Sequence, residues 1–178
     1  MLDPEQTLTT PHLRLEALVE AHANELFGYL QDARLYQFYA GEPPASVAAL
    51  HQQYAQWRTR TSPDGRQIWL NYAVRRADGV FVGWVQATVE NDRATIGYDI
   101  FPQFWRRGYA TEACRALVRM LCAAHMQTIR AVVDSENIAS IRLLERLGFR
   151  RMHMEPSDDL PGRQDAHYER VCKPRGER

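Results

Sequence analysis

The run W-R-R-G-Y-A at residues 105–110 has residue types that suit the binding of an anion. Arg106 and Arg107 precede a glycine at the point where a strand-like pattern gives way to a helical one. The first N–H groups of a helix have no partner within the helix and carry partial positive charge, so they attract anions. Gly108 allows a ligand to approach the backbone closely, and the small Ala110 leaves the first turn clear. A diphosphate would fit here, although a turning glycine beside two solvated arginines would give the same composition.

Two elements must hold this loop in place. Before it, Ile96, Tyr98 and Ile100 alternate with smaller or more polar residues, which predicts a strand over residues 95–101. After it, apolar residues recur with helical spacing over residues 110–122. The apolar run at 129–133 then predicts a short buried strand. A strand–helix–strand crossover of this length makes the two strands parallel, and ligands bind at the carboxyl ends of such strands.

A second polar pair follows the parallel strand. Asn137 and Ser140 are three residues apart, so both project from the first turn of the helix that Ile141, Leu144 and Leu147 predict. Asn137 suits a helix cap, and a solvated hydroxyl is the ordinary role of a helical serine. The pair nevertheless lies beside the carboxyl end of the parallel strand.

The runs G-Y-D-I-F-P-Q-F-W-R-R-G-Y-A-T-E-A, at 97–113, and N-I-A-S-I-R-L-L-E-R-L-G-F, at 137–149, carry a resemblance to a known family. They resemble the GNAT superfamily of acetyl-CoA-dependent N-acetyltransferases, in its RimJ/RimL-like branch, and the likeness extends over most of the chain. In that family the pattern Q/R-x-x-G-x-G/A binds the cofactor pyrophosphate. Here the pattern falls on Trp105, Gly108 and Ala110, so Trp105 departs from the usual first residue. Arg106 replaces a common glycine and adds charge.

The resemblance implies acetyl-CoA (coenzyme A) as the co-substrate. In the family the pantetheine arm lies between two parallel strands that splay apart, and it bonds to exposed backbone groups. The residues implied in cofactor binding are Ile100, Phe101, Trp105, Arg106, Arg107, Gly108, Tyr109, Ala110 and Asn137.

The resemblance also implies a reaction. Acetyl transfer from a thioester to an amine needs a neutral amine, a polarised carbonyl and a proton for the departing thiolate. The sequence has no G-x-S-x-G elbow and no cysteine in a nucleophile signature, which favours direct transfer between two bound substrates. In the Rim-like branch the serine that matches Ser140 is the acid that protonates the thiolate.

The general base is left open. Many relatives have a glutamate two residues before the glycine of the central strand, where this chain has Thr95. Asp99, on the same face of that strand, and Glu90, at the end of the preceding strand, are the candidate catalytic carboxylates. Either is more often solvated or salt-bridged. Deprotonation through a water chain is a further alternative.

The remaining sequence predicts an α/β (α+β) fold in a single domain over residues 1–178. Residues 12–18 predict a strand, 19–31 and 46–60 predict two helices, and 68–75 and 80–89 predict a hairpin that leads into the central strand. Residues 152–154 and 167–171 predict two final strands. An antiparallel meander followed by a β-α-β crossover gives a mixed central sheet with helices on both faces, in agreement with the GNAT-like fold that the resemblance implies.

Charge and composition limit the classes of partner that the chain is expected to bind. Lysine plus arginine and aspartate plus glutamate number 22 each, so no net charge draws the chain to nucleic acid or an anionic membrane. The N-terminus does not read as a secretory signal and no apolar run has membrane-spanning length, so a cytoplasmic location is expected. Cys114, Cys122 and Cys172 lack metal-ligand spacing. We expect them to be reduced core residues, and we expect no metal site.

The acceptor is a small-molecule or peptide amine of open identity. Phe38, Tyr39, Trp84 and Tyr168 could line its pocket, although such aromatic residues more often belong to the core. Members of the branch acetylate protein N-termini, polyamines, amino acids and aminoglycosides, and the fold does not choose among them. The alternatives are a non-catalytic acyl-CoA-binding sensor or interaction module and a nucleotide-phosphate binder. A homodimer is compatible with the sequence.

Overall fold

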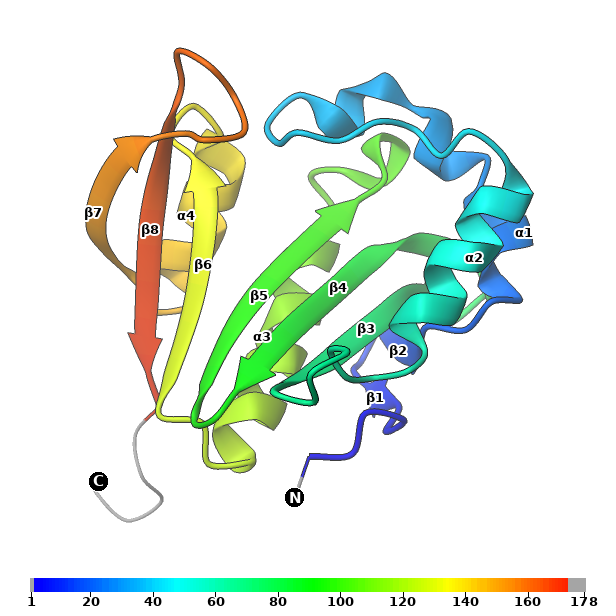
Figure 1. The fold of residues 1–178 in the computed structure, drawn as a ribbon, viewed down its shortest axis with the longest axis horizontal. Helices are drawn as coiled ribbons and strands as arrows, with labels where there is room; N and C mark the ends of the chain where they lie inside the picture. Colours follow the sequence, from blue (N-terminus) through cyan, green and yellow to red (C-terminus); the bar gives the residue numbers. More distant parts are fainter. Residues whose placement is uncertain (1, 173–178) are drawn as a thin grey trace.

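The structure, a computed structural model, describes residues 2–172 and is built on an eight-stranded sheet (Figure 1). The strands are β1 (Leu8–Thr9), β2 (Leu13–Ala17), β3 (Gln67–Arg76), β4 (Phe81–Glu90), β5 (Arg93–Ile100), β6 (Thr128–Asp134), β7 (Arg150–Pro156) and β8 (Gln164–Val171). The helices are α1 (His22–Leu26), α2 (Val47–Trp57), α3 (Tyr109–Ala123) and α4 (Ile138–Arg146), with short 3-10 turns η1 (Tyr29–Gln31), η2 (Ala33–Tyr36) and η3 (Pro102–Phe104). Over residues 2–172, no helix is long and apolar enough to cross a membrane.

The strand order is β1-β2-β3-β4-β5-β6-β8-β7. Neighbouring strands from β1 to β5 are antiparallel, β5 and β6 are parallel, and β8 lies antiparallel between β6 and β7. Helices α3 and α4 lie on one face of the sheet, and α2 lies on the other (Figure 1). The predicted fold class, a meander followed by a β-α-β crossover, is confirmed.

Local signals explain most element boundaries. Ser46 caps α2, because its Oγ accepts a hydrogen bond from the Ala49 N–H at 3.1 Å. Gly148 follows α4 with φ +82°, the left-handed conformation that ends many helices. The predicted helix over 19–31 is wrong in length: α1 has five residues, and Gly28 separates it from η1. Ala21 supplies no side-chain cap to α1, which leaves this short helix dependent on packing.

The core lies on both sides of the sheet. The apolar stripe of α3 packs against the strands through Ala113, Cys114, Leu117, Val118 and Leu121, which are all buried. Tyr168 of β8 is only 1% exposed, so the structure assigns it to the core and not to an acceptor pocket.

The expectation of three reduced cysteines is wrong. Cys122 and Cys172 form a disulfide with their Cα atoms 5.3 Å apart, while Cys114 is free and buried, and its burial raises the pKa of the thiol. The topology brings the pair together, because Cys122 is in the last turn of α3 and Cys172 follows β8, whose Val171 is opposite Thr128 at the start of β6. A separation of 50 residues gives no local sequence signal for this pairing.

Candidate functional site

A gap between β5 and β6 is the central feature of the site. The two strands pair over three residues, Arg93–Thr95 with Thr128–Arg130, and then diverge (Figure 1). Beyond Thr95, β5 continues to Ile100 along β4 on its other side. The splay that the resemblance implied is present.

The backbone of β5 faces this gap at alternate residues. The Phe101 N–H donates to the Val82 C=O at 2.8 Å, towards β4, so the backbone groups of Tyr98 and Ile100 point to the gap. However, the Ile100 C=O accepts a hydrogen bond from the Trp105 indole N–H, and the Phe101 C=O accepts one from the Phe104 N–H. Ile100 and Phe101, the two backbone positions expected to hold the cofactor, therefore have local partners, and Tyr98 is the better placed residue.

A cavity of about 320 Å³ occupies the gap and reaches both faces of the sheet. On the face away from α3 its lining includes Phe38, Tyr39, Trp84 and Gln86. On the other face its lining includes Ile96, Tyr98 and the first turn of α4. Two molecules that enter from opposite faces of the sheet would therefore meet in the gap between β5 and β6.

Asp99 lies on the face of the sheet away from α3. It is opposite Trp84 in the β4–β5 register, and its Oδ2 accepts a hydrogen bond from the Tyr39 hydroxyl at 3.3 Å. Burial raises the pKa of Asp99 to about 7, although hydrogen bonds from Tyr39 and the Ile100 N–H act in the opposite direction. A carboxyl group with this pKa can accept a proton near neutral pH.

Asn137 and Ser140 lie together at the start of α4, where they line the cavity. Asn137 is the N-cap, and its Oδ1 accepts a hydrogen bond from the Ser140 N–H at 3.1 Å. The Tyr98 hydroxyl lies 3.5 Å from the Ser140 carbonyl oxygen, to which it donates. Burial raises the pKa of Tyr98, so its hydroxyl stays protonated. Tyr98 and Ser140 thus line the same part of the cavity, and sequence reasoning identified only Ser140 as a proton donor.

Glu90 lies away from this site. It is opposite Arg93 where β4 ends, whereas Trp84 is opposite Asp99. Glu90 is the sixth residue after Trp84, a distance of about 20 Å along β4. Of the two candidate carboxylates, Asp99 contacts Tyr39 and is opposite Trp84, which both line the cavity, whereas Glu90 lies at the other end of β4.

The start of α3 has the backbone conformation that anion binding needs. Gly108 is the N-cap with φ +83°, and Arg106 is also left-handed with φ +61°. The Glu112 N–H donates to the Gly108 C=O at 3.1 Å as the first helical bond, so the N–H groups of residues 109–111 precede any partner within the helix. Arg106 and Arg107 are exposed beside them.

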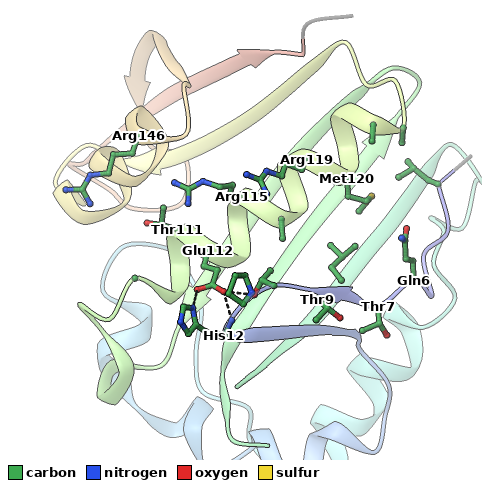
Figure 2. Close-up of a pocket in the computed structure, with 18 residues that line it drawn as sticks. Gln6, Thr7, Thr9, His12, Thr111, Glu112, Arg115, Arg119, Met120 and Arg146 are labelled. Carbon is green, nitrogen blue, oxygen red and sulfur yellow. Dashed lines mark hydrogen bonds and ion pairs between the residues drawn. The ribbon is translucent and has the colours of Figure 1, made fainter. Parts of the chain in front are cut away.

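A groove of about 1060 Å³ continues from this helix start along α3 (Figure 2). Arg115 and Arg119 project from α3 and Arg146 projects from α4 along it. Glu112, also on α3, accepts hydrogen bonds from the Thr10 hydroxyl at 2.6 Å and the His12 N–H at 2.9 Å, which reach it from the segment between β1 and β2. Burial opposes ionisation of Glu112, but these hydrogen bonds outweigh it and lower the pKa. The groove has the larger volume, but Tyr98 and Ser140, whose hydroxyl groups can donate a proton, line the cavity and not the groove.

Sequence reasoning missed two features that shape the cavity. The contact between Tyr39 and Asp99 joins residues 60 apart and has no local signal. Gly83 had a signal, because a glycine inside a strand pattern marks a close backbone approach. A Cβ at Gly83 would lie 2.1 Å from the Asp99 carbonyl oxygen and 2.9 Å from the Ile100 Cα, so glycine is required for β4 to pass Asp99.

Comparisons with known proteins agree with this geometry. Residues 12–150 match the family described as an acetyltransferase (GNAT) domain. The protein named uncharacterized N-acetyltransferase p20, from Bacillus licheniformis, is 29% identical over 149 residues, or 82% of this chain and 83% of that protein. The structure of Mycobacterium smegmatis RimJ has a TM-score of 0.82 at 19% identity, over 94% of this chain and 88% of that one. That of RimL, a ribosomal L7/L12 alpha-N-protein acetyltransferase, has a TM-score of 0.81 at 16% identity, over 93% and 98%.

Proposed function

The chain belongs to the GNAT acetyltransferase family, and from this premise we propose that it transfers the acetyl group of acetyl-CoA directly to a primary amine. The observation that carries the proposal is the cavity of about 320 Å³ in the gap between β5 and β6, which reaches both faces of the sheet. Two substrates entering from opposite faces would be held in contact there. Such an arrangement supplies a large share of the acceleration without a covalent enzyme intermediate.

Acetyl-CoA fits the face that carries α3 and α4. Its diphosphate would bind the N–H groups of residues 109–111 beside Arg106 and Arg107, and its pantetheine arm would follow the Tyr98 backbone. Arg115 and Arg119 extend the cationic surface beyond the helix start. In support, the similar structures include RimJ in complex with CoA-disulfide and RimL in complex with coenzyme A.

Asp99 is the proposed base. Its carboxylate takes a proton from the ammonium form of the acceptor, and the neutral nitrogen then attacks the thioester carbonyl. The C–N bond forms as the C–S bond breaks. Tyr39 positions the carboxylate through its hydrogen bond of 3.3 Å. This assignment supplies the base that Thr95 cannot provide.

The departing thiolate takes a proton from a hydroxyl beside the start of α4, and that hydroxyl regains a proton from the acylated nitrogen, which loses its second proton as the amide forms. Ser140 is the proposed donor, as the resemblance implies. Tyr98 is a second candidate because its hydroxyl lies 3.5 Å from the Ser140 carbonyl and remains protonated. Both residues line the cavity on the face proposed for acetyl-CoA.

The acceptor side favours an amine that arrives with positive charge. Asp159 and Asp165 line the cavity together with Phe38, Tyr39 and Trp84. Carboxylates and aromatic faces both attract ammonium groups. A protein N-terminus, a polyamine, an amino acid or an aminoglycoside-like molecule meets this requirement.

A non-catalytic acyl-CoA-binding sensor is the second candidate, favoured by Thr95 at the position where many relatives have glutamate. The two functions are separated by measuring thiol release from acetyl-CoA across a library of amines. Release with one amine class supports the enzyme. Stabilisation by acetyl-CoA without release from any amine would identify the sensor.

Cofactor binding is tested at Gly108. We expect acetyl-CoA at a hundredfold excess over its Kd to stabilise the fold by about 2.7 kcal/mol, measured as a thermal shift. Gly108→Glu should abolish the shift, because it places negative charge where the diphosphate binds. Gly108→Asn is the matched control, since asparagine tolerates the left-handed φ of +83°. An undiminished shift in folded Gly108→Glu protein would remove the diphosphate site.

A further inference from the structure

A cluster of two histidines and a glutamate lies at the far edge of the sheet, outside the machinery described above. β7 and β8 pair antiparallel, with His153 opposite His167 and Glu155 two residues further along β7. Residues i and i+2 of a strand share a face, so the three side chains lie on one surface. One ligand atom from each of them lies within 4.8 Å of the other two.

The Nε2 atoms of both histidines lie near the same carboxylate, that of Glu155. His167 Nε2 lies 2.8 Å from Glu155 Oε1, and His153 Nε2 lies 3.9 Å from Glu155 Oε2. The two imidazole rings are stacked, with centroids 4.3 Å apart and planes 10° from parallel. His167 Nε2 is inaccessible to solvent and its contact with Glu155 lacks hydrogen-bond geometry. A buried ring nitrogen without a directional partner is a ligand atom that a cation would satisfy.

Charge near the cluster also favours a cation. Asp165 is opposite Glu155 in the β7–β8 register, and like charges in directly opposed positions destabilise a sheet. His153 is 57% exposed and Glu155 is 55% exposed, so their side chains can turn without disturbing the core. Tetrahedral zinc holds its ligands at about 2.0–2.2 Å, which requires ligand atoms roughly 3.4 Å apart. Closing the cluster from its present spacing therefore requires a shift of up to about 1.4 Å and a rotation of the stacked rings, so that their lone pairs converge on one ion.

We propose that His153, Glu155 and His167 form a site for a divalent transition metal of the zinc class. Two imidazoles and one carboxylate are a ligand set that zinc accepts, with a fourth position left to solvent or another ligand. The sequence-based expectation of no metal rested on cysteine spacing, whereas these ligands come together through strand pairing. The metal would join β7, an edge strand exposed along its whole length, to β8.

The site borders the acceptor side of the cavity. His167 is opposite Val132 on β6 and two residues from Asp165, and both of these residues line the cavity. The loop between β7 and β8 also contributes Ser157, Asp159 and Leu160 to that lining. A metal at the base of this loop would fix the position of one cavity wall. This inference holds whether or not the chain transfers acetyl groups.

The test is calorimetric titration of Zn²⁺ into the oxidised, chelator-treated full chain at fixed pH, with Co²⁺ absorption as a second readout. We expect one saturable Zn²⁺ per chain and the visible bands of tetrahedral Co²⁺. His153→Asn, His167→Asn and Glu155→Gln should each weaken binding by at least about tenfold, since even loss of an outer-shell partner costs that much. Melting curves without metal verify that each variant is folded.

His12→Asn is the matched control. It also removes an imidazole that contacts a carboxylate, here Glu112 at 3.1 Å, but one without a second histidine. This variant should bind Zn²⁺ as the parent chain does. Wild-type affinity in folded His153→Asn and His167→Asn proteins, or the absence of saturable Zn²⁺ binding to the parent chain, would overturn the proposal.

Discussion

Asp99 is the residue whose protonation sets the pH range of the proposed reaction. Because its pKa is raised to about 7, the carboxylate form that accepts a proton accumulates as pH rises through neutrality. We expect kcat/KM to rise with an inflection near pH 7. Asp99→Asn should remove this inflection and lower kcat/KM by roughly 10²- to 10⁴-fold. Steady-state kinetics between pH 5.5 and 9 measure both effects.

The acceptor amine also titrates, so the assay needs two amines of different pKa. An inflection due to Asp99 stays in place when the amine is changed, whereas one due to the amine moves. Tyr39→Phe provides a second control, because losing a hydrogen bond that lowers the pKa of Asp99 should move its inflection upward. An inflection that survives in Asp99→Asn would exclude this carboxylate as the base.

The same pKa affects stability with a defined sign. The folded pKa of about 7 lies above the ordinary aspartate value of 3.8, so the folded state binds the proton more tightly. The stabilising contribution is complete below pH 3.8 and is lost as pH rises through about 7. Asp99→Asn should therefore lose less stability than the parent chain over this interval.

Ser140 and Tyr98 compete for the role of acid. If Ser140 protonates the thiolate, Ser140→Ala should lower kcat by roughly ten- to a thousandfold and leave acetyl-CoA affinity unchanged, because the proton is needed only in the transition state. If Tyr98 is the donor, Tyr98→Phe carries that loss and Ser140→Ala retains wild-type turnover. Kinetics paired with calorimetric acetyl-CoA binding distinguish the two residues. A large loss of affinity in Ser140→Ala would make Ser140 a binding residue.

At the scale of elements, the approach of β4 to β5 positions Asp99. Gly83→Ala would bring a methyl group to 2.1 Å from the Asp99 carbonyl oxygen, so the strands must move apart. We expect a loss of about 1–3 kcal/mol in the free energy of unfolding, measured with denaturant. Turnover should fall further than the unfolded fraction explains, because Asp99 is displaced.

Gly28→Ala is the matched control for this substitution. A Cβ at Gly28 meets nothing within 4 Å, and its φ of −62° suits any residue. This change should be neutral or stabilise the chain by up to about 1 kcal/mol. Equal stability of the two variants would show that the close approach at Gly83 does not shape the strand pair.

Elements with one buried face were predictable, and those without one were not. The meander, α3 and β6 follow from apolar periodicity, and Ser46 and Gly148 mark helix ends through their own chemistry. β7 extends beyond the predicted 152–154 because it is exposed throughout and has no burial pattern to read. The contacts of Asp99 with Tyr39 and of Tyr98 with Ser140 span 60 and 42 residues, so only the folded topology reveals them.

At the scale of the whole molecule, the disulfide joins the last turn of α3 to the segment after β8. Closing a loop of about 50 residues reduces the entropy of the unfolded chain, and we expect Cys122→Ser to cost about 2–4 kcal/mol of stability. Denaturant unfolding with and without reductant measures this cost. The parent chain should lose the same amount on reduction, and Cys122→Ser should be insensitive to reductant. Identical stability of the oxidised and reduced parent would contradict the bridge.

The position of this disulfide has a mechanical consequence. Within residues 2–172, the ladder between β5 and β6 occupies the end of the gap near Thr128, and the disulfide lies at the same end. Because the two strands are joined at that end, we expect any motion that widens the gap to be a rotation of β6 relative to β5 about the joined end. The displacement between the strands would grow with distance from the joined end and be greatest near Ile100 and Asp134, where the strands end. A small change in the angle between β5 and β6 thus becomes a large change in the width of the gap where the two substrates would meet.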